Sequence, residues 1–455
     1  MKSLSSSRQA SLALLGTGLG NAITILDVTV VNVSITTIQH ALGANVAQLQ
    51  WVISIYTLVF AVFILSGGAL IDRYGARRVF MVGVIIFTVF SAGCGLSHHI
   101  YALLVARACQ GLGAALCFPA SLALLSDVYP EQGSRAKAIS IWGSIGGLAL
   151  AVGPLLGGLL IAFSGWRSIF LLNIPVGVIA LGALWPVTPC HSDKKPRSLD
   201  FFGQLTVIPA LGGLVFACIE SGLQGWQNPV VLSGILLSAV MIPLFILTQY
   251  RAKAPMMPLD LYCSGKVTSA FIAGFTVNFV YYGVLFAFSL FFQSDRGLSA
   301  LQTGLTFLPM TVFAGVSNLF SGRLIARNGP ILPLLGGIGL ACLGCLALLE
   351  LELTTSYVWM IVPMLMIGAG AAFTIPAFSV IVMMNVPALR RGIASGVLNA
   401  GRQTGGVLGV GIFGSLMSRY SIAGLHSALG ISAFILIATG ILVWSVTAKR
   451  AFSTV

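Results

Sequence analysis

The chain alternates long apolar stretches with short polar connections from one end to the other. A helix needs about 20 residues to cross the ~30 Å hydrocarbon core of a bilayer, and each apolar stretch is long enough to do so. The pattern therefore predicts about fourteen membrane-spanning helices. We place them at residues 11–37, 47–71, 78–97, 101–126, 137–163, 167–188, 201–220, 229–250, 267–292, 302–322, 331–351, 355–383, 393–418 and 427–447.

The composition indicates lipid rather than water as the solvent of this chain. Hydrophobic residues make up 57% of its 455 positions, charged residues make up 8%, and the mean hydropathy is +0.99. A soluble domain carries about 25% charged residues, so this chain has too few to cover a water-facing surface. We expect an all-α polytopic membrane protein.

The distribution of basic residues predicts the orientation in the membrane. Of the 24 Lys and Arg residues, nineteen fall in the predicted connections on the side of the two termini, and three (Arg167, Arg296 and Arg419) fall on the other side. Basic connections stay in the cytoplasm, so we expect both termini there. The net charge of +13 then reflects topology, and we expect no nucleic-acid partner.

Two six-helix blocks resemble each other and flank a pair of extra helices. Residues 68–75 and 322–329 follow the second span of each block and match at five of eight positions. Residues 111–120 and 368–377, in the two fourth spans, also agree. Duplicated halves are typical of transporters whose substrate site lies between them. The predicted domains are a bundle at 1–188, an insert with its linkers at 189–266, and a bundle at 267–455.

Asp27 is the only acidic residue placed well inside a predicted span. A charged group inside a membrane is costly and marks a functional site by default. Burial favours the neutral form of a carboxylic acid, so Asp27 is a candidate to take up and release a coupling proton. The alternative is a structural carboxyl group that hydrogen-bonds to a neighbouring helix.

Two arginines also lie within predicted spans. A buried Arg107 requires hydrogen-bond acceptors, and it either assists proton release or binds backbone carbonyl groups; both roles remain open. Arg402 lies nearer the cytoplasmic end, where a long side chain can reach the interface, and a structural role is preferred. The candidate residues of a polar cavity are Asn32, Gln110, Arg402 and Gln403.

Two motifs are candidates for a conformational gate. The connection after the second span has glycines that permit a tight turn and charges that can hold a gate closed; solvated charges are the alternative. The fifth span has glycines at a spacing that lets another helix approach and a proline that can bend it; ordinary tight packing is the alternative. The candidate residues are Gly68, Asp72, Arg73, Gly75, Arg77, Gly143, Gly147, Gly153, Pro154, Gly157 and Gly158.

These motifs resemble those of the major facilitator superfamily, in particular its fourteen-helix drug:proton antiporter branch. The matching segments are 26–33, 68–78, 107–115, 153–158, 166–175 and 402–406. The resemblance implies a major facilitator fold of six, two and six helices in a bacterial inner (plasma) membrane. It also implies that Asp27 bears the coupling proton, that Arg107 assists its movement, and that the fifth-span motif shapes the gate.

The expected activity is proton-coupled export of small amphipathic compounds by alternating access. The expected partners are the lipid bilayer, a small-molecule substrate and protons, with a periplasmic adaptor left open, and we expect a monomer. The sequence shows neither a metal-site spacing nor a nucleotide-binding P-loop, so we expect no metal and no cofactor, and the proton gradient supplies the energy.

Three other activities are alternatives to this one. A dedicated exporter of one antibiotic or metabolite is the alternative within transporters. A channel or non-transporting receptor fits the repeat and the single buried carboxyl less well, and no nucleophile or metal constellation indicates an enzyme. The spans from 267 to 447 hold no deeply placed acid, which favours neutral, zwitterionic or singly charged substrates over multivalent cations.

Overall fold

The computed structural model describes residues 6–188, 199–387 and 390–448, and within these ranges it contains helices and no strand. Its elements are α1 (Ser6–Val33), α2 (Ile35–Leu42), α3 (Val46–Tyr74), α4 (Ala76–Gly95), α5 (Ile100–Val128), α6 (Gln132–Ser164), α7 (Ser168–Leu171), α8 (Asn173–Leu184), α9 (Phe201–Gln224), α10 (Pro229–Arg251), η1 (Leu259–Cys263), α11 (Gly265–Leu290), η2 (Phe291–Asp295), α12 (Ala300–Thr306), α13 (Leu308–Asn328), α14 (Ile331–Ala347), α15 (Tyr357–Asn385) and α16 (Arg391–Ala448). The predicted all-α class is confirmed for this part of the chain.

The number of long apolar helices differs from the predicted number of spans. Within the described ranges, ten helices are long and apolar enough to cross a membrane, or eleven if the bent pair α12 and α13 forms one span. Two predicted spans appear as shorter apolar segments, at Ser168–Leu184 and Ile331–Ala347. The last two predicted spans are joined in α16, although Ser421 interrupts it with a non-helical backbone (φ 47°).

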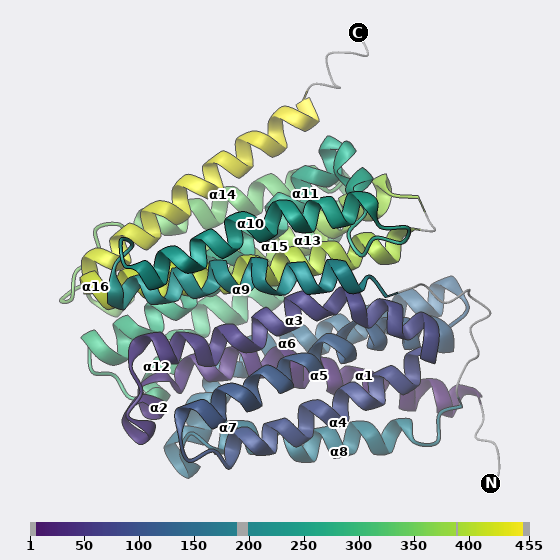
Figure 1. Ribbon diagram of the computed structural model, residues 1–455, viewed down its shortest axis with the longest axis horizontal. Helices are drawn as coiled ribbons and strands as arrows, with labels where there is room; N and C mark the ends of the chain where they lie inside the picture. Colours follow the sequence, from purple (N-terminus) through teal and green to yellow (C-terminus); the bar gives the residue numbers. More distant parts are fainter. Residues whose placement is uncertain (1–5, 189–198, 388–389, 449–455) are drawn as a thin grey trace.

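The helices form two bundles that lie side by side (Figure 1). Helices α1 to α8 occupy the lower part of this view, and α11 to α16 occupy the upper and rear part. The start of α1 and the end of α16 point toward the same side, whereas α2, α7 and α12 lie at the opposite end. Helix α3 packs against α16, and α6 packs against α12 and α13. These three contacts join the two bundles.

The two helices between the bundles, α9 and α10, have different environments. Helix α9 packs against α3 and α16, and Gln204 at its start accepts a hydrogen bond from Ser66 Oγ (2.6 Å) and donates to the carbonyl of Val62 (3.2 Å). Helix α10 packs mainly on α9 and exposes large apolar side chains such as Leu236 and Val240. An exposed apolar face of this size is suited to contact with lipid.

Side-chain caps define where several helices begin. Asn45 and Gln48 form a reciprocal capping box at the start of α3, and Ser299 and Gln302 form another at the start of α12. Asp200 accepts a hydrogen bond from the amide of the third residue of α9. Each cap satisfies backbone amide groups that have no partner within the helix.

Glycines allow the closest helix contacts. A Cβ added at Gly111 of α5 would overlap the carbonyl of Tyr56 on α3. In the other bundle, a Cβ at Gly405 or Gly409 of α16 would overlap the carbonyls of Phe275 and Phe279 on α11. Small residues permit such backbone contact between helices in membranes.

We expect Gly409→Ala to destabilise the fold, because its methyl group would overlap the α11 backbone. Overpacking of this kind costs about 1–3 kcal/mol, which should lower the melting temperature in detergent. Gly401→Ala is the matched control on the same helix, since a Cβ there meets no atom within 4 Å. Equal melting temperatures for the two variants would contradict the packing described for α11 and α16.

Candidate functional site

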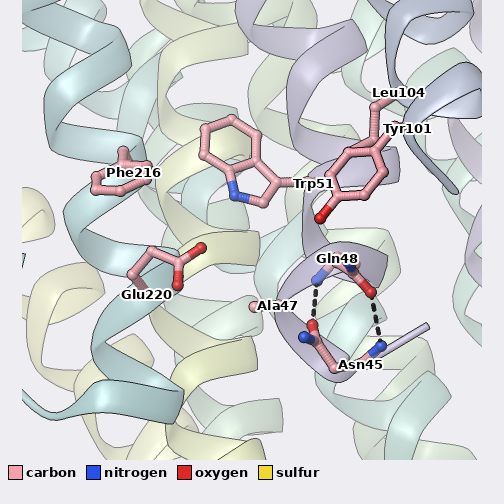
Figure 2. A pocket seen from close by; sticks show the side chains of 8 residues that line it. All are labelled: Asn45, Ala47, Gln48, Trp51, Tyr101, Leu104, Phe216 and Glu220. Atoms are coloured by element: carbon pink, nitrogen blue, oxygen red, sulfur yellow. Dashed lines mark hydrogen bonds between the residues drawn. The ribbon is translucent and has the colours of Figure 1, made fainter. Parts of the chain in front are cut away.

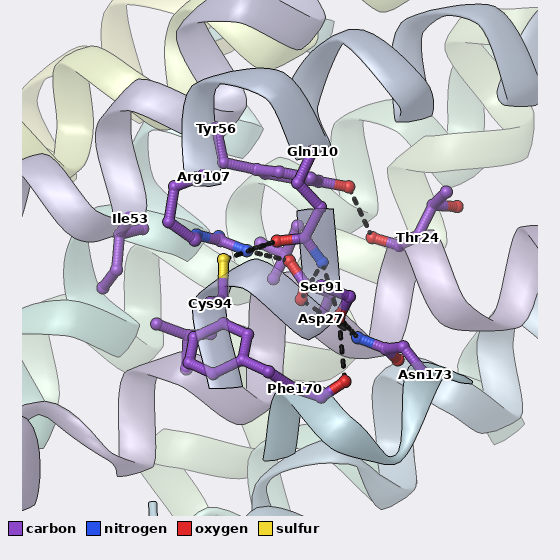
Figure 3. A network of polar contacts seen from close by, with 12 residues as sticks. Thr24, Asp27, Ile53, Tyr56, Ser91, Cys94, Arg107, Gln110, Phe170 and Asn173 are labelled. Carbon is purple, nitrogen blue, oxygen red and sulfur yellow. Dashed lines mark hydrogen bonds and ion pairs between the residues drawn. The ribbon is translucent and has the colours of Figure 1, made fainter. Parts of the chain in front are cut away.

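A buried ion pair joins α1 to α5 in the centre of the first bundle (Figure 3). The carboxylate of Asp27 accepts a hydrogen bond from Nη1 of Arg107. The two side chains are 1% and 0% exposed, respectively. Among the described residues, these are the only charged residues that are fully buried. The prediction that Asp27 lies deep inside the protein is therefore confirmed, and its partner is Arg107.

Polar side chains from three further positions surround the carboxylate. Gln110 donates to Asp27 Oδ1 at 3.0 Å, and Asn173 at the start of α8 lies 3.4 Å from the same oxygen. Both amides also donate to Ser91 Oγ, at 3.2 and 3.0 Å. Ser91 in turn donates to the carbonyl of Phe170 at 2.8 Å. The carboxylate is thus held by one cation and two amide donors.

Arg107 has acceptors beyond the carboxylate. Its Nε donates to the carbonyl of Val52 on α3 (3.0 Å), and Nη1 also donates to Gln110 Oε1 (2.8 Å). The guanidinium carbon lies 4.4 Å from the ring centroid of Tyr56, a cation–π contact. Both roles that the sequence left open for Arg107 therefore have a structural counterpart, because it binds a backbone carbonyl and the acidic group.

The local sequence explains why these groups meet. Arg107, Gln110 and Gly111 are three and four residues apart, so they share one face of α5. Gly111 lets this face approach the backbone of α3 at Tyr56. The guanidinium group then lies between α3 and α1, within reach of both a carbonyl group and Asp27.

This arrangement can hold two charge states. With Asp27 ionised, two opposite charges compensate each other in an interior of low dielectric constant. A proton on the carboxylate would remove that compensation and leave the guanidinium group with only neutral acceptors. The hydrogen bonds of Asp27, and with them the contact between α1 and α5, would therefore differ between the ionised and the protonated carboxyl group.

The other candidate cavity residues lie apart from this network. Arg402 donates to Asn399 Oδ1 (3.1 Å) and lies over the ring of Phe378. Gln403 is half-buried on the same helix. Asn32 is buried near the end of α1, where its carbonyl accepts a hydrogen bond from Ser289 of α11. Gln110, the fourth candidate, is fully buried and belongs to the Asp27 network.

The connection between α3 and α4 forms the predicted tight turn. Gly75 has a positive φ of 84°, and it ends α3 immediately before α4 begins. Arg77 donates to the carbonyls of Leu184 and Trp185 at the end of α8, at 3.1 and 2.7 Å. Arg73 lies over the ring of Tyr74. Arg77 therefore ties this turn to α8 of the same bundle.

Gly68 and Asp72 are the other two residues predicted as part of this gate motif. A Cβ added at Gly68 meets no atom within 4 Å, and Asp72 follows it near the end of α3. The role of the motif as a gate stays a prediction.

Helix α6 makes close contacts along only part of its predicted glycine face. A Cβ at Gly153 would overlap Thr29 of α1, and Gly157 packs against Val30. A Cβ at Gly158 would lie 2.8 Å from the carbonyl oxygen of Ala300 on α12. Pro154 lies inside this helix and faces the same contact, because a Cβ added at Gly304 of α12 would overlap its carbonyl.

The expectation of close helix contact is wrong for Gly143 and Gly147. A Cβ added at either position meets no atom within 4 Å. The face that approaches α1 in this part of α6 is instead that of Gly146, which contacts Asn21 and Ile25.

Sequence reasoning missed Tyr56, Ser91 and Asn173 as members of the buried network. The available signal was a polar side chain within an apolar stretch, because a buried polar group needs a hydrogen-bond partner. Asn173 was noted only as part of a motif, and nothing in the sequence showed that it faces Asp27.

We expect Asp27→Asn to lower the stability of the folded chain. Removing one member of a buried ion pair leaves an uncompensated charge and costs about 3–5 kcal/mol. The double variant Asp27→Asn, Arg107→Gln should recover part of this loss, because it removes the remaining charge. Thermal unfolding in detergent measures both, with Glu350→Gln at an exposed carboxyl as the control. A double variant no more stable than Asp27→Asn alone would contradict the pairing.

Comparison with known proteins places this geometry in a family. Residues 17–410 match the Major Facilitator Superfamily. The chain is 37% identical over 422 residues to the multidrug resistance protein Stp of Mycobacterium tuberculosis, covering 93% of this chain and 78% of the relative. It is 34% identical over 400 residues to the methylenomycin A resistance protein of Bacillus subtilis, covering 88% and 86%.

Solved structures show the same fold. A peptide transporter of the POT family, described as auto-inhibited, superimposes with a TM-score of 0.66 at 14% identity over 98% of this chain and 97% of that structure. A bacterial homologue of the human lysosomal transporter Spinster, in an inward-facing and occupied conformation, gives 0.65 at 18% identity over 96% and 97%. The family match and the relatives above show that the chain belongs to the Major Facilitator Superfamily.

Proposed function

We propose that this chain is a proton-coupled exporter of small amphipathic compounds. The buried Asp27–Arg107 pair is the observation that carries the proposal, because it supplies a carboxyl group that a proton can neutralise. The relatives are named for multidrug resistance, drug efflux and antibiotic resistance, which supports export as the activity.

Proton coupling follows from competition for the carboxylate. Ionised Asp27 binds Arg107, and a proton on Asp27 ends that attraction. Asp27 lies on α1, which packs against α6 and reaches the second bundle through the carbonyl of Asn32. A change in the position of α1 therefore acts on the contact between the two bundles. This is the physical link between proton binding and movement that secondary transport requires.

Alternating access is supported by where the two bundles touch. At the end of the molecule opposite the chain ends, Thr36 donates to Gln293 (2.5 Å), and nearer the middle of α6 Thr311 donates to the carbonyl of Ala151 (2.9 Å). Gly158 packs on the backbone of α12 at the same end. This conformation is closed on that side, and export requires that these contacts separate.

We further propose fourteen spans arranged as six, two and six. Ser421 divides α16 into two spans, the bent pair α12 and α13 forms one, and the segments Ser168–Leu184 and Ile331–Ala347 each supply one. The domains are then 1–188, 189–266 and 267–455, with α9 and α10 as the insert. The basic connections support a cytoplasmic location for both termini.

The substrate class follows from the charge of the second bundle. No carboxylate in its described residues is fully buried, so a dication would find no second compensating charge there. We propose neutral, zwitterionic or singly charged amphiphiles as substrates. A dedicated exporter of one antibiotic is the second candidate, because one relative is named for resistance to methylenomycin A alone. A resistance profile over many compounds separates these two activities.

The family and its relatives indicate a transporter rather than an enzyme. We propose that the chain acts as a monomer in a bacterial inner membrane, driven by the proton gradient without a metal or cofactor. A periplasmic adaptor would be needed only where export continues across a second membrane.

Asp27→Asn should strongly slow efflux driven by a proton gradient, because an amide side chain, unlike a carboxyl group, does not take up and release a proton. In proteoliposomes with an imposed gradient, we expect dye efflux at least roughly tenfold slower than for the native chain, the loss expected when a required proton carrier is removed. Glu350→Gln removes an exposed carboxyl and should leave the rate unchanged. Gradient-driven efflux that survives in Asp27→Asn would exclude this mechanism.

Gly158→Ala should slow transport while leaving the fold intact. Its methyl group would press on the carbonyl of Ala300 and disfavour the closed end by about 1–3 kcal/mol. Gly147→Ala on the same helix is the control, since a Cβ there meets no atom within 4 Å. Efflux rates are compared at equal amounts of monodisperse protein. Equal rates would show that this contact does not limit the transport cycle.

A further inference from the structure

A hollow of about 440 Å³ lies on the outside of the bundle where the inserted helix α9 meets α3 and α5 (Figure 2). We call it the α9 groove. It lies at the starts of α3 and α5 and near the end of α9, which is the end of the molecule opposite the chain ends. The residues that line it are Asn45, Ala47, Gln48, Trp51, Tyr101, Leu104, Phe216 and Glu220.

Aromatic rings form the walls of the α9 groove. The rings of Trp51 and Phe216 lie 6.3 Å apart between their centroids, and Trp51 lies between Phe216 and Tyr101 in Figure 2. Tyr101 is 67% exposed although it lies on a helix of an apolar bundle. Exposed Trp and Tyr near helix ends are typical of the depth at which lipid headgroups meet the hydrocarbon core.

Glu220 supplies a negative charge within this aromatic wall. It lies one turn before the end of α9, is half-buried, and accepts a hydrogen bond from Gln224 at 2.9 Å. No basic side chain forms an ion pair with it in the part of the chain that the structure describes. The guanidinium group of Arg419 lies by Gly225 and over the ring of Tyr420.

The two amide side chains of the groove already have partners for their oxygens, because Asn45 and Gln48 each accept a hydrogen bond from the other's backbone amide in the capping box of α3. The carboxylate of Glu220 is the charged acceptor of the groove, and the rings beside it present electron-rich faces. A cation with an apolar stem satisfies both features, because carboxylates and aromatic faces each attract organic ammonium groups.

We propose that the α9 groove binds the ammonium headgroup of an aminophospholipid from the adjacent leaflet. Glu220 accepts hydrogen bonds from the ammonium group, while Trp51 and Phe216 contact the groups that follow it. A lipid is the favoured source because the groove opens on the outer surface of the bundle rather than toward the contact between the two halves. The site depends on the insert, since Phe216 and Glu220 both belong to α9, and it is independent of what the chain transports.

The test compares lipid-dependent stability of the full chain in nanodiscs. Phosphatidylglycerol discs containing phosphatidylethanolamine should give a higher melting temperature than discs of phosphatidylglycerol alone. In Glu220→Gln, the content of phosphatidylethanolamine needed for half of the rise in melting temperature should increase roughly tenfold or more, as expected for loss of a charge-assisted contact. Glu350→Gln, at an exposed carboxyl outside the groove, should behave like the native chain.

A second variant and a soluble cation test the site further. Phe216→Leu removes an aromatic wall but keeps the charge, and it should weaken the same effect while retaining native helix content in phosphatidylglycerol alone. Dodecyltrimethylammonium, added to the detergent-solubilised chain, tests a soluble cation at the same site. Stabilisation by this cation but not by phosphatidylethanolamine would overturn the lipid as occupant. An unchanged lipid response in Glu220→Gln would overturn the site itself.

Discussion

A charge buried in an apolar interior must be compensated, and the first bundle is organised around one such compensation. Asp27 and Arg107 compensate each other's charge, and the network that holds them draws on α3, α4 and α8. Helix α3 gives a carbonyl and an aromatic ring, α4 gives Ser91, and α8 gives Asn173. A shift of any one helix therefore leaves a buried polar group without a partner.

The core of the second bundle is built from different side chains. Its core is rich in aromatic side chains from α11, and α16 approaches that helix through glycines at Gly405 and Gly409. Arg402, the arginine within one of its predicted spans, has a neutral amide and a ring as neighbours rather than a carboxylate. The repeat recognised in the sequence therefore concerns the course of the chain, whereas the fully buried ion pair of the described residues belongs to the first half.

The sequence predicted the class of fold and the two buried charges, because both follow from the free-energy cost of placing polar groups in an apolar environment. Apolar stretches of sufficient length have few alternatives to a membrane helix, and an acid within one of them is conspicuous. It did not predict that Asp27 pairs with Arg107, because that depends on how α1 and α5 rotate about their axes. Such rotations are set by contacts like Gly111 against Tyr56, which involve residues far apart in sequence.

The same reasoning explains where sequence patterns failed. Glycine spacing predicted close contact at Gly143 and Gly147 as well, but in this part of α6 the glycine that approaches α1 is Gly146, and the predicted contacts begin at Gly153. The break between the last two predicted spans, at 419–426, is by contrast consistent with the structure, because it contains the non-helical residue Ser421 of α16.

Short connections also determine what an outside molecule can recognise. At the end opposite the chain ends, helices are joined by segments as brief as 96–99, 165–167 and 225–228, so most of that face consists of helix tips. Two segments of that face are longer: the short helix α2, with His40 and Ala41 exposed, and the connection 348–356, with Glu350 exposed. An antibody raised against the native chain, or an adaptor protein docking on that face, would therefore have these two segments as its main epitopes beyond the helix tips.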